Sequence, residues 1–390
     1  MEFPAPLFLL LPLAAGAVVY CGMVCAAVVS YRRRAARLPA PGTHPQPAFS
    51  ILKPLRGLDD GLEENLRSFF RQDYPHFEIL LGIDTEDDPA LPVAEAVRRE
   101  FPNVPSRILV TGESPYRNPK DYSLERMAAE ARHDILVMSD SDIRVGPEML
   151  RTLAAEFADP ELGCLTCPYR AVPGRSFWTR LEALGMNTEF MAGVLVARLV
   201  EGMKFGVGPT MVMRREALEA IGGFSRVKDS YIDDFLLGRY AAEAGFRTEL
   251  SAYVIEHRIG SQPFWKNIKH RVMWQRGTRF SRPAGYYGQA FTFPIPMALL
   301  LLLAAPSWWP LAALAAAARY VAAWAVAGPA LRDPLFRRWW WLLPLQDVVS
   351  WLSWLAAFFG NTIVWRGRRY RLGAEGRLIP AASKPDPAGR

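Results

Sequence analysis

The sequence predicts an α/β domain with a mixed, mostly parallel sheet, placed between apolar segments at the two ends of the chain. The first apolar segment, residues 7–31, carries no charged residue, and most residues of 290–365 are Ala, Leu, Trp and Phe. Between these segments, short apolar runs alternate with amphipathic runs of ordinary charge content. Continuous apolar strands separated by helices indicate parallel pairing with both faces of the sheet covered.

The alternation begins at residue 49 and predicts a layered, Rossmann-like domain. The expected strands cover residues 49–55, 77–84, 106–112 and 133–142, and the expected helices cover 61–72, 90–100 and 123–131. A glycine turn, a short strand, a helix and a Gly-Gly stop follow within 206–224. Ligands of such sheets bind beyond the carboxyl ends of the strands. The acids at or just past expected strand ends are Asp84, Asp87, Asp88, Asp140 and Asp142.

Residues 7–31 are long enough to cross a bilayer core of ~30 Å at ~1.5 Å per residue. The alternative, a cleaved signal peptide, needs a basic start and a shorter apolar run. The basic residues follow the run instead and are Arg32, Arg33, Arg34 and Arg37. By the positive-inside rule, the domain that follows is expected on the cytoplasmic face. The net charge of +7 is modest, and much of the basic excess clusters beside the apolar segments, which favours lipid headgroups over nucleic acid as the partner.

The apolar region near the carboxyl end predicts a hairpin followed by a third element. Residues 290–305 and 308–328 are expected to form the hairpin, and 331–338 to return to the cytoplasmic side. The last run, 339–365, has basic residues on both sides, which favours a re-entrant or interfacial element over a simple crossing.

The four cysteines predict no metal centre. Cys21 and Cys25 lie in the first apolar segment, and Cys164 and Cys167 form a single C-x-x-C without the second pair of a tetrahedral zinc site. Structural burial is therefore expected for both pairs, with a redox or metal role as the less favoured alternative.

Asp140 and Asp142 close the fourth expected strand and form a D-x-D motif. Mg²⁺ and Mn²⁺ prefer oxygen ligands and join protein carboxylates to substrate phosphates. If the backbone turns past the strand end, one carboxylate can reach a metal while the other reaches a sugar or ribose. The motif therefore suits a nucleoside diphosphate, although a D-x-D also occurs as an ordinary surface turn.

Asp233 and Asp234 stand before a helix-like stretch at 235–245. One interpretation is an acidic pair stabilised by the positive end of the helix dipole. The other is a general base that removes the proton of an attacking hydroxyl group. The glycine turn upstream would let backbone approach a bound ligand closely.

These elements, in this order, resemble the ceramide glucosyltransferase family and its bacterial hopanoid-associated relatives. The motifs that carry the resemblance are "LKPLRGLD" (52–59), "DDPA" (87–90), "YRNPKDYSL" (116–124), "SDSDIRV" (139–145), "AIGGF" (220–224), "DDF" (233–235) and "WRGRRYRL" (365–372). The resemblance implies a metal-dependent, inverting transferase of the GT-A type that uses a UDP-sugar. The implied organisation is a transmembrane anchor at 1–31, a basic linker at 32–48, a cytoplasmic GT-A domain at 49–285, a membrane region at 286–372 and a polar tail at 373–390.

The resemblance also implies roles for individual residues. Asp142, together with Asp140, would belong to the metal and diphosphate motif, and Asp234, beside Asp233, would be the base. The residues implied near the donor nucleotide or its phosphates are Lys53, Asp88, Lys120 and Asp140.

Two departures from the family pattern concern the acceptor. The family's (Q/R)-x-x-R-W motif falls at 270–274, where Trp274 is in place but His270 and Met273 replace the Gln or Arg and the Arg. The residues that could deliver the missing charge are Arg271, Arg276 and Arg279. The ceramide enzymes carry a His-Pro pair where this chain has Asn187 to Phe190, which favours the hopanoid-type branch, an N-acetylglucosamine donor and a polyol acceptor.

The expected function is inverting transfer of a hexose or N-acetylhexosamine from a UDP-sugar to a lipid hydroxyl, on a hopanoid polyol or ceramide. The expected location is the bacterial inner membrane, with several crossings and the catalytic domain in the cytoplasm, and the expected cofactor is Mg²⁺ or Mn²⁺. A processive polysaccharide synthase is one alternative, but it usually needs more membrane helices and the complete motif. A non-catalytic membrane scaffold is the other, but it would be expected to have lost the acids.

Overall fold

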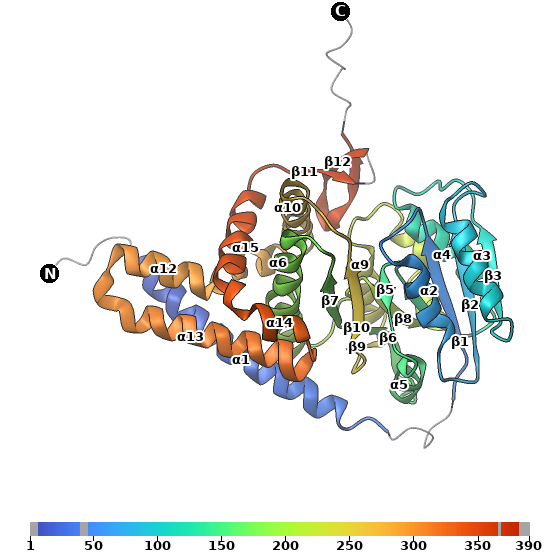
Figure 1. Cartoon of the computed structure of the whole chain (residues 1–390), viewed down its shortest axis with the longest axis horizontal. Coiled ribbons are helices and arrows are strands. Elements are labelled where there is room, and N and C mark those ends of the chain that lie inside the picture. The colour runs from blue at the N-terminus through green and yellow to red at the C-terminus, as the bar shows by residue number, and fades with distance from the viewer. Residues whose placement is uncertain (1–6, 40–45, 366–367, 382–390) are drawn as a thin grey trace, which may run out of the picture.

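The computed structural model describes residues 7–39, 46–365 and 368–381. Parts of the predicted anchor, linker and tail, and two residues of the basic motif at 365–372, lie outside these ranges. Figure 1 shows a sheet-containing domain on the right and a group of long helices on the left. Between them stand three helices, α6 (Phe177–Gly185), α10 (Phe264–Ser281) and α15 (Leu343–Ala357), which run across the direction of the long helices.

The central sheet has seven strands in the order β3-β2-β1-β4-β8-β6-β9. Their bounds are β1 Phe49–Leu55, β2 Phe77–Ile83, β3 Ser106–Val110, β4 Ile135–Ser139, β6 Leu162–Thr166, β8 Thr210–Arg214 and β9 Arg247–Leu250. Strands β1 to β4 pair in parallel, β8 is antiparallel to both β4 and β6, and β9 is parallel to β6. The predicted mixed, mostly parallel sheet is confirmed.

Helices cover both faces of this sheet, because successive side chains of a strand point to opposite faces. In β1, Ile51 packs in the cluster that contains α2 (Leu62–Phe70) and α3 (Ala90–Glu100). The next residue, Leu52, packs in the cluster that contains α4 (Pro119–Glu130), α8 (Arg215–Ala220) and α9 (Asp233–Glu243). The short helix α5 (Met149–Glu156) joins the first cluster. The sheet therefore buries apolar side chains on both faces, as its nearly continuous apolar strands predict.

Most predicted elements of this domain are found close to their expected residues, and α3 has the expected bounds. Helix α4 begins at Pro119, four residues earlier than expected. The side chain of Asn118 accepts a hydrogen bond from the backbone N–H of Lys120 at 3.2 Å, and proline occupies the first helical position. Both features stabilise a helix start.

Two smaller sheets are absent from the sequence-based prediction. One has the order β5-β10-β7, formed by Ile143–Arg144, Ile255–Ile259 and Tyr169–Pro173. The other has the order β11-β12-β13, formed by Thr362–Trp365, Arg368–Leu372 and Leu378–Pro380. The second sheet takes up part of the segment expected to be a basic flank and a polar tail.

Three helices of the described ranges are long and apolar enough to cross a membrane: Leu7–Ala35, Phe177–Glu201 and Pro306–Ala330. A fourth candidate is the pair Pro283–Phe291 and Pro294–Ala304, which is bent by 50°. Helices α12 (Pro294–Ala304) and α13 (Trp309–Ala325) form the predicted hairpin, turned at η4 (Pro306–Trp308), and lie against α1 (Leu7–Ala35).

Two further apolar elements, the candidate at Phe177–Glu201 and helix α15, differ from a simple crossing. The candidate at Phe177–Glu201 is not predicted from the sequence; it consists of α6, a π-helical turn and α7 (Met191–Glu201), and is mostly buried inside the protein. Helix α15, from the last apolar run, has 15 residues, or roughly 22 Å of helix, which is shorter than a bilayer core. It packs against α10 and α6, and its interfacial placement stays a prediction.

Candidate active site at the strand ends

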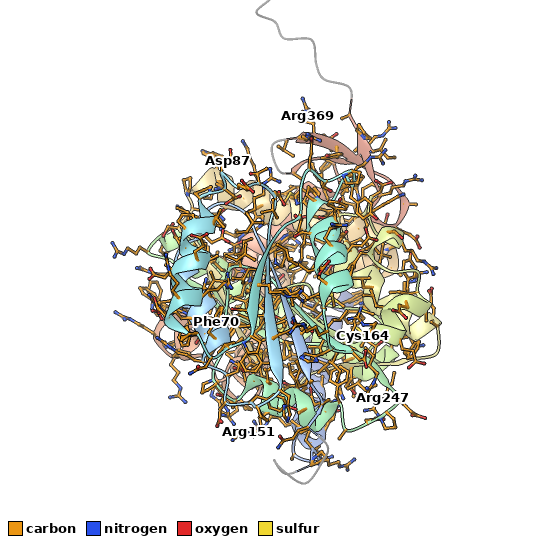
Figure 2. All side chains as sticks on the ribbon, turned by 90° about the vertical axis from the view of Figure 1, so that its right-hand side faces the viewer. Phe70, Asp87, Arg151, Cys164, Arg247 and Arg369 are labelled. Atoms are coloured by element: carbon orange, nitrogen blue, oxygen red, sulfur yellow. The ribbon has the colours of Figure 1, made fainter. Side chains whose placement is uncertain are left out.

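Asp140 and Asp142 lie directly after β4, in the middle of the central sheet. The backbone turns there: Asp140 N–H donates to Pro209 O at 3.0 Å, and Ile143 N–H donates to Asp140 O at 3.3 Å. Figure 2 shows Asp87, which follows β2, at the upper end of the domain, and Arg151 at the opposite end. The turn expected past the strand end is therefore present, at the edge of the sheet where ligands of this fold class bind.

Two lysines converge on Asp140. Lys120 Nζ lies 2.6 Å from Asp140 Oδ1. Lys53 is fully buried, its Nζ is 4.0 Å from the centre of the Phe69 ring, and it donates a hydrogen bond to the backbone carbonyl of Asp140. Lys53 thus holds the D-x-D backbone in place, whereas Lys120 places its charge on the Asp140 carboxylate. Contact of either lysine with donor phosphates stays a prediction.

The environment moves the pKa values of the two lysines in opposite directions. Burial lowers the pKa of Lys53 to about 7, and the nearby carboxylates of Asp140 and Asp142 offset only part of this effect. Burial also acts to lower the pKa of Lys120, but the carboxylates of Asp140 and Asp233 outweigh it and raise that pKa above its ordinary value. Lys120 is therefore the permanent cation of the site.

His257 pairs with Asp142 and was not identified from the sequence. Its Nε2 lies 3.0 Å from Asp142 Oδ2, and its ring meets the ring of Tyr169 edge to face at 5.4 Å between centres. Burial opposes the ionised form of Asp142, but His257 outweighs it and lowers the pKa of the carboxyl. The contact exists because β10 pairs antiparallel with β5, which places His257 opposite Ile143.

The Asp142–His257 pair has the donor atoms that a divalent cation requires. Asp142 Oδ1 and His257 Nδ1 are buried without a hydrogen-bond partner among the described residues. Carboxylate oxygens suit Mg²⁺ and Mn²⁺, and imidazole is a common further ligand for transition metals. Within the described ranges, no group of three or more His, Cys, Asp or Glu side chains is arranged to hold a metal by itself. Asp142 and His257 fit such an ion if a bound ligand completes its coordination, whereas the contact of Asp140 with Lys120 occupies the other predicted ligand.

Asp234 lies in the first turn of α9 rather than before the helix, a position compatible with both interpretations of this acidic pair. Burial and the neighbouring carboxylate of Asp233 raise the pKa of Asp234 to about 7. A Cβ atom built on Gly208 would lie 2.7 Å from Asp234 Oδ2, and one on Gly206 would collide with Asp234 O. The glycine turn therefore packs directly on Asp234, and only glycine leaves room for the carboxylate.

Asp121 is a further buried acid of this region, to which the sequence alone gives no role, although it lies within the motif at 116–124. It is buried on α4, and burial together with the carboxylate of Asp233 raises its pKa well above the ordinary value. We call the five acids of this region the acid cluster: Asp121, Asp140, Asp142, Asp233 and Asp234. Helices α4 and α9 and the end of β4 bring them together, although up to 113 positions separate them in the chain.

Asp88 has structural contacts in the loops at this edge. Its Oδ1 accepts hydrogen bonds from Gly57 N–H at 2.9 Å and Ala90 N–H at 2.8 Å. It therefore ties the loop after β1 to the start of α3. Gly57 has a φ of +67°, a backbone conformation that favours glycine. A contact of Asp88 with a nucleotide stays a prediction.

His270 and Arg271 begin the segment aligned with the (Q/R)-x-x-R-W motif. Both lie on α10 and contact buried polar side chains of this helix and its neighbours. His270 Nδ1 lies 3.1 Å from Glu182 Oε1, and the rings of His270 and Trp274 are 4.2 Å apart at their centres. Arg271 donates to Asn267 Oδ1 at 2.9 Å and to Gln346 Oε1 at 3.0 Å. One terminal nitrogen of Arg271 is buried without a partner among the described residues, so this arginine retains a free donor.

The later arginines of α10 hold the end of α15 instead. Arg276 donates to Thr362 O at 2.6 Å and to Phe359 O at 2.7 Å. Arg279 donates to Ala357 O at 2.6 Å and to further carbonyls of the same turn. The last carbonyls of a helix lack intrahelical partners, and Arg279 satisfies those at the end of α15, whereas Arg276 binds carbonyls that follow the helix. The structure thus gives Arg276 and Arg279 a role in packing, and no described contact joins them to the acid cluster.

The C-x-x-C cysteines are structural. Cys164 and Cys167 are free and buried, and burial raises the pKa of both thiols. A thiol whose pKa is raised by an apolar environment is a poor nucleophile and a poor metal ligand. Figure 2 shows Cys164 within the body of the domain.

Comparison with curated proteins identifies lipid glycosyltransferases as relatives. Ceramide glucosyltransferase 1 of Caenorhabditis elegans is 27% identical over 209 residues, which cover 53% of this chain and 44% of that protein. Ceramide glucosyltransferase of Komagataella phaffii is 40% identical over 101 residues, 25% of this chain and 20% of that protein. Beta-monoglucosyldiacylglycerol synthase of a Synechocystis species is 24% identical over 191 residues, 47% of this chain and 38% of that protein. The chain thus matches less than half the length of these relatives.

Solved structures with a related fold include the mannosyltransferase PcManGT of Pyrobaculum calidifontis in complex with GDP-Man and Mn²⁺. It is 20% identical, with a TM-score of 0.48, over 88% of this chain and 99% of that one. The family model described as glycosyl transferase family 21 matches residues 9–378, nearly the whole chain. The resemblance found in the motifs is thereby confirmed, and the chain belongs to glycosyl transferase family 21.

Proposed function

We propose that this protein transfers a hexose or N-acetylhexosamine, with inversion, from a UDP-sugar to a hydroxyl group of a membrane lipid. The observation that carries the proposal is the acid cluster, in which Asp234, with a pKa of about 7, lies near the D-x-D turn. Family membership and the apolar helices support sugar transfer at a membrane. The relatives are named for ceramide or diacylglycerol acceptors, which supports a lipid as the substrate.

Asp234 is the proposed general base. A base is most effective when its pKa lies near the working pH, and burial with Asp233 sets that value here. In the proposed step, the lipid hydroxyl oxygen forms a bond to the anomeric carbon while the bond from that carbon to the diphosphate oxygen breaks. The hydroxyl proton moves to a carboxylate oxygen of Asp234, and the electron pair of the broken bond leaves with UDP. A single displacement of this kind inverts the anomeric centre.

The leaving diphosphate requires positive charge at the D-x-D turn. Lys120 supplies a permanent cation there, with its Nζ on Asp140. Asp142 and His257 are the residues that would hold a divalent cation, and such an ion supplies counter-charge to a departing diphosphate when it is bound. Asp142 is kept ionised by His257, so the carboxylate is ready to act as a ligand.

The acceptor reaches this site from the membrane side. Helices α6, α10 and α15 stand between the long apolar helices and the sheet domain (Figure 1). The contact between His270 and Glu182 joins α10 to α6, and the negative charge of Glu182 also acts to raise the pKa of His257. We therefore assign the segment around His270 and Trp274 to the acceptor side, with the hopanoid polyol and ceramide as the two candidate lipids.

The test is label transfer by the full-length protein in lipid nanodiscs. Tritiated UDP-glucose or UDP-N-acetylglucosamine is supplied with Mg²⁺ or Mn²⁺ and with ceramide, diacylglycerol or a hopanoid polyol. The proposal predicts label in one discrete lipid after organic extraction. Label in a long polymer would instead indicate a processive synthase, and the absence of transfer from every donor and acceptor would contradict the assignment as an enzyme.

A further inference from the structure

A basic cavity of about 670 Å³ lies at the end of the first membrane helix, outside the acid cluster. It is lined by residues of α1, of the turn that follows α1, and of α7. The lining residues are Cys25, Ala26, Val29, Ser30, Arg33, Arg34, Arg37 and Arg198. The sugar-transfer chemistry does not account for four arginines gathered around an open cavity.

The cavity is apolar at one end and basic at the other. Ala26, Val29, Ser30 and Arg33 follow helical spacings of three and four residues, so they lie along one side of α1, and Arg37 follows in the turn after the helix. The apolar members belong to the part of α1 that can cross the membrane, and the arginines lie one to three turns further on. From residue 25 to residue 35, where α1 ends, the helical rise is roughly 15 Å, a length comparable to a lipid headgroup and the upper part of an acyl chain.

Two of the four arginines are neutralised by carboxylates. Arg34 lies 3.1 Å from Glu156 and 3.1 Å from Glu249, and Arg198 lies 2.7 Å from Glu249. These ion pairs fix α1 and α7 to the sheet domain, because Glu156 ends α5 and Glu249 lies in β9.

The other two arginines are not neutralised. Within the described ranges, the exposed side chains of Arg33 and Arg37 have neither an ion pair nor a hydrogen bond. With two glutamates against four arginines, the cavity carries an excess of two positive charges. On α7, Leu199 and Val200 follow Arg198 and are exposed, with 62% of Val200 accessible, so apolar surface continues beside the basic residues.

We propose that this cavity binds an anionic phospholipid, with its phosphate between Arg33 and Arg37 and an acyl chain along the Ala26 and Val29 side. Arginine suits phosphate because its guanidinium group donates two parallel hydrogen bonds. The cytoplasmic leaflet is anionic, and basic residues next to a membrane helix are drawn to it. The site is separate from the transferase reaction, so it stands even if the proposed function is wrong.

The experiment is native mass spectrometry of the full-length protein in detergent, titrated with phosphatidylglycerol or with phosphatidylcholine. The proposal predicts one preferentially retained phosphatidylglycerol. The double variant Arg33→Gln/Arg37→Gln is expected to weaken this binding on the order of 30-fold, since each basic side chain near an anionic surface contributes about 1 kcal/mol. The matched control, Arg337→Gln/Arg338→Gln, removes two exposed arginines of α14 (Pro334–Trp339) and is expected to change it less than twofold.

A second variant tests the apolar half without a change in charge. Val29→Trp is expected to exclude the acyl chain and to weaken phosphatidylglycerol binding, while the thermal unfolding midpoint of the apoprotein stays within a few degrees. Equal losses in the Arg337/Arg338 control would show that only general surface charge acts and would overturn the proposal. So would equal retention of phosphatidylcholine, or full competition by millimolar inorganic phosphate, which would identify a soluble phosphate site.

Discussion

The acid cluster and the contact between α13 and α15 both bury charged side chains, but they treat the charge differently. Arg319 of α13 makes two hydrogen bonds of 2.8 Å with Asp347 of α15, and both side chains are at most 5% exposed. In the acid cluster, Asp142 has a buried oxygen without a hydrogen-bond partner among the described residues, and the pKa of Asp234 is raised to about 7 by burial and Asp233.

This difference is the one expected between a structural charge and a charge in a reactive site. A buried pair that satisfies itself holds elements together and needs no ligand. Buried acids that repel each other and lack partners are costly, and such groups concentrate at sites that bind and react. The acid cluster has five carboxylates facing Lys120, Lys53 and His257, and the raised pKa of Asp234 indicates that these groups offset its negative charge only in part.

The largest expected effect comes from a substitution in the acid cluster. Asp234→Asn keeps the shape of the side chain but removes the base, and is expected to lower the rate of lipid labelling about 1000-fold, or about 4 kcal/mol in the barrier. The measurement is the initial rate at saturating donor. The control Asp134→Asn alters a carboxylate that is 92% exposed, and it should leave the rate unchanged. Equal rates for Asp234→Asn and wild type would contradict the role of Asp234.

The next largest effect comes from a substitution in the buried ion pair between α13 and α15. Arg319→Ala leaves the Asp347 charge buried and is expected to lower the free energy of unfolding by about 3 kcal/mol. Thermal unfolding in detergent measures this loss. The comparison variant, Arg247→Ala, removes the partner of Asp159 in a pair whose arginine is about half exposed, and should cost less than about 1 kcal/mol. Similar losses in the two variants would show that the α13–α15 pair does not hold the helices together.

A smaller effect tests the pair of Asp142 and His257. His257→Ala removes the imidazole 3.0 Å from Asp142, and is expected to raise the metal concentration for half-maximal binding by about 10- to 100-fold. Calorimetric titration of Mn²⁺ in the presence of UDP measures the affinity without a need for turnover. His76→Ala, at an exposed position, is the matched control. An unchanged Mn²⁺ affinity would remove His257 from the proposed ligand set.

The smallest expected effect is the dependence of the rate on pH. Because the base must be ionised, and burial with Asp233 raises its pKa to about 7, activity should rise about tenfold between pH 6 and pH 8. Asp233→Asn removes the nearest like charge, which lowers the pKa of Asp234, so the rise should move toward lower pH. Lys120 and Asp140 also act on Asp234 and are unchanged in this variant. A shift toward higher pH would contradict the assigned cause.

The sequence predicts the strand–helix domain well because its signals are local. The apolar runs of β1 and β2, the helix α3 and the acids after β4 can each be recognised within about ten residues of chain. The family motifs also point to Asp234 as the base. Without them, the sequence around this residue would indicate only the start of a helix. The position of this residue at the amino end of α9 is compatible with both interpretations.

What the sequence does not predict depends on long-range pairing. His257 reaches Asp142 only because β10 pairs with β5, across more than one hundred residues. Asp121 becomes functionally interesting only when α9 places Asp233 beside it. The small sheet of β11, β12 and β13 was missed because its arginines resemble the basic flank of a membrane segment.

The most direct test of the central claim is the pH dependence of lipid labelling in wild type and in Asp234→Asn, measured in the same nanodiscs at saturating donor. The account predicts a wild-type rate that rises about tenfold from pH 6 to pH 8, and a variant rate that is low and independent of pH over this range. A variant that keeps the wild-type rise would contradict it, because another group would then be accepting the proton.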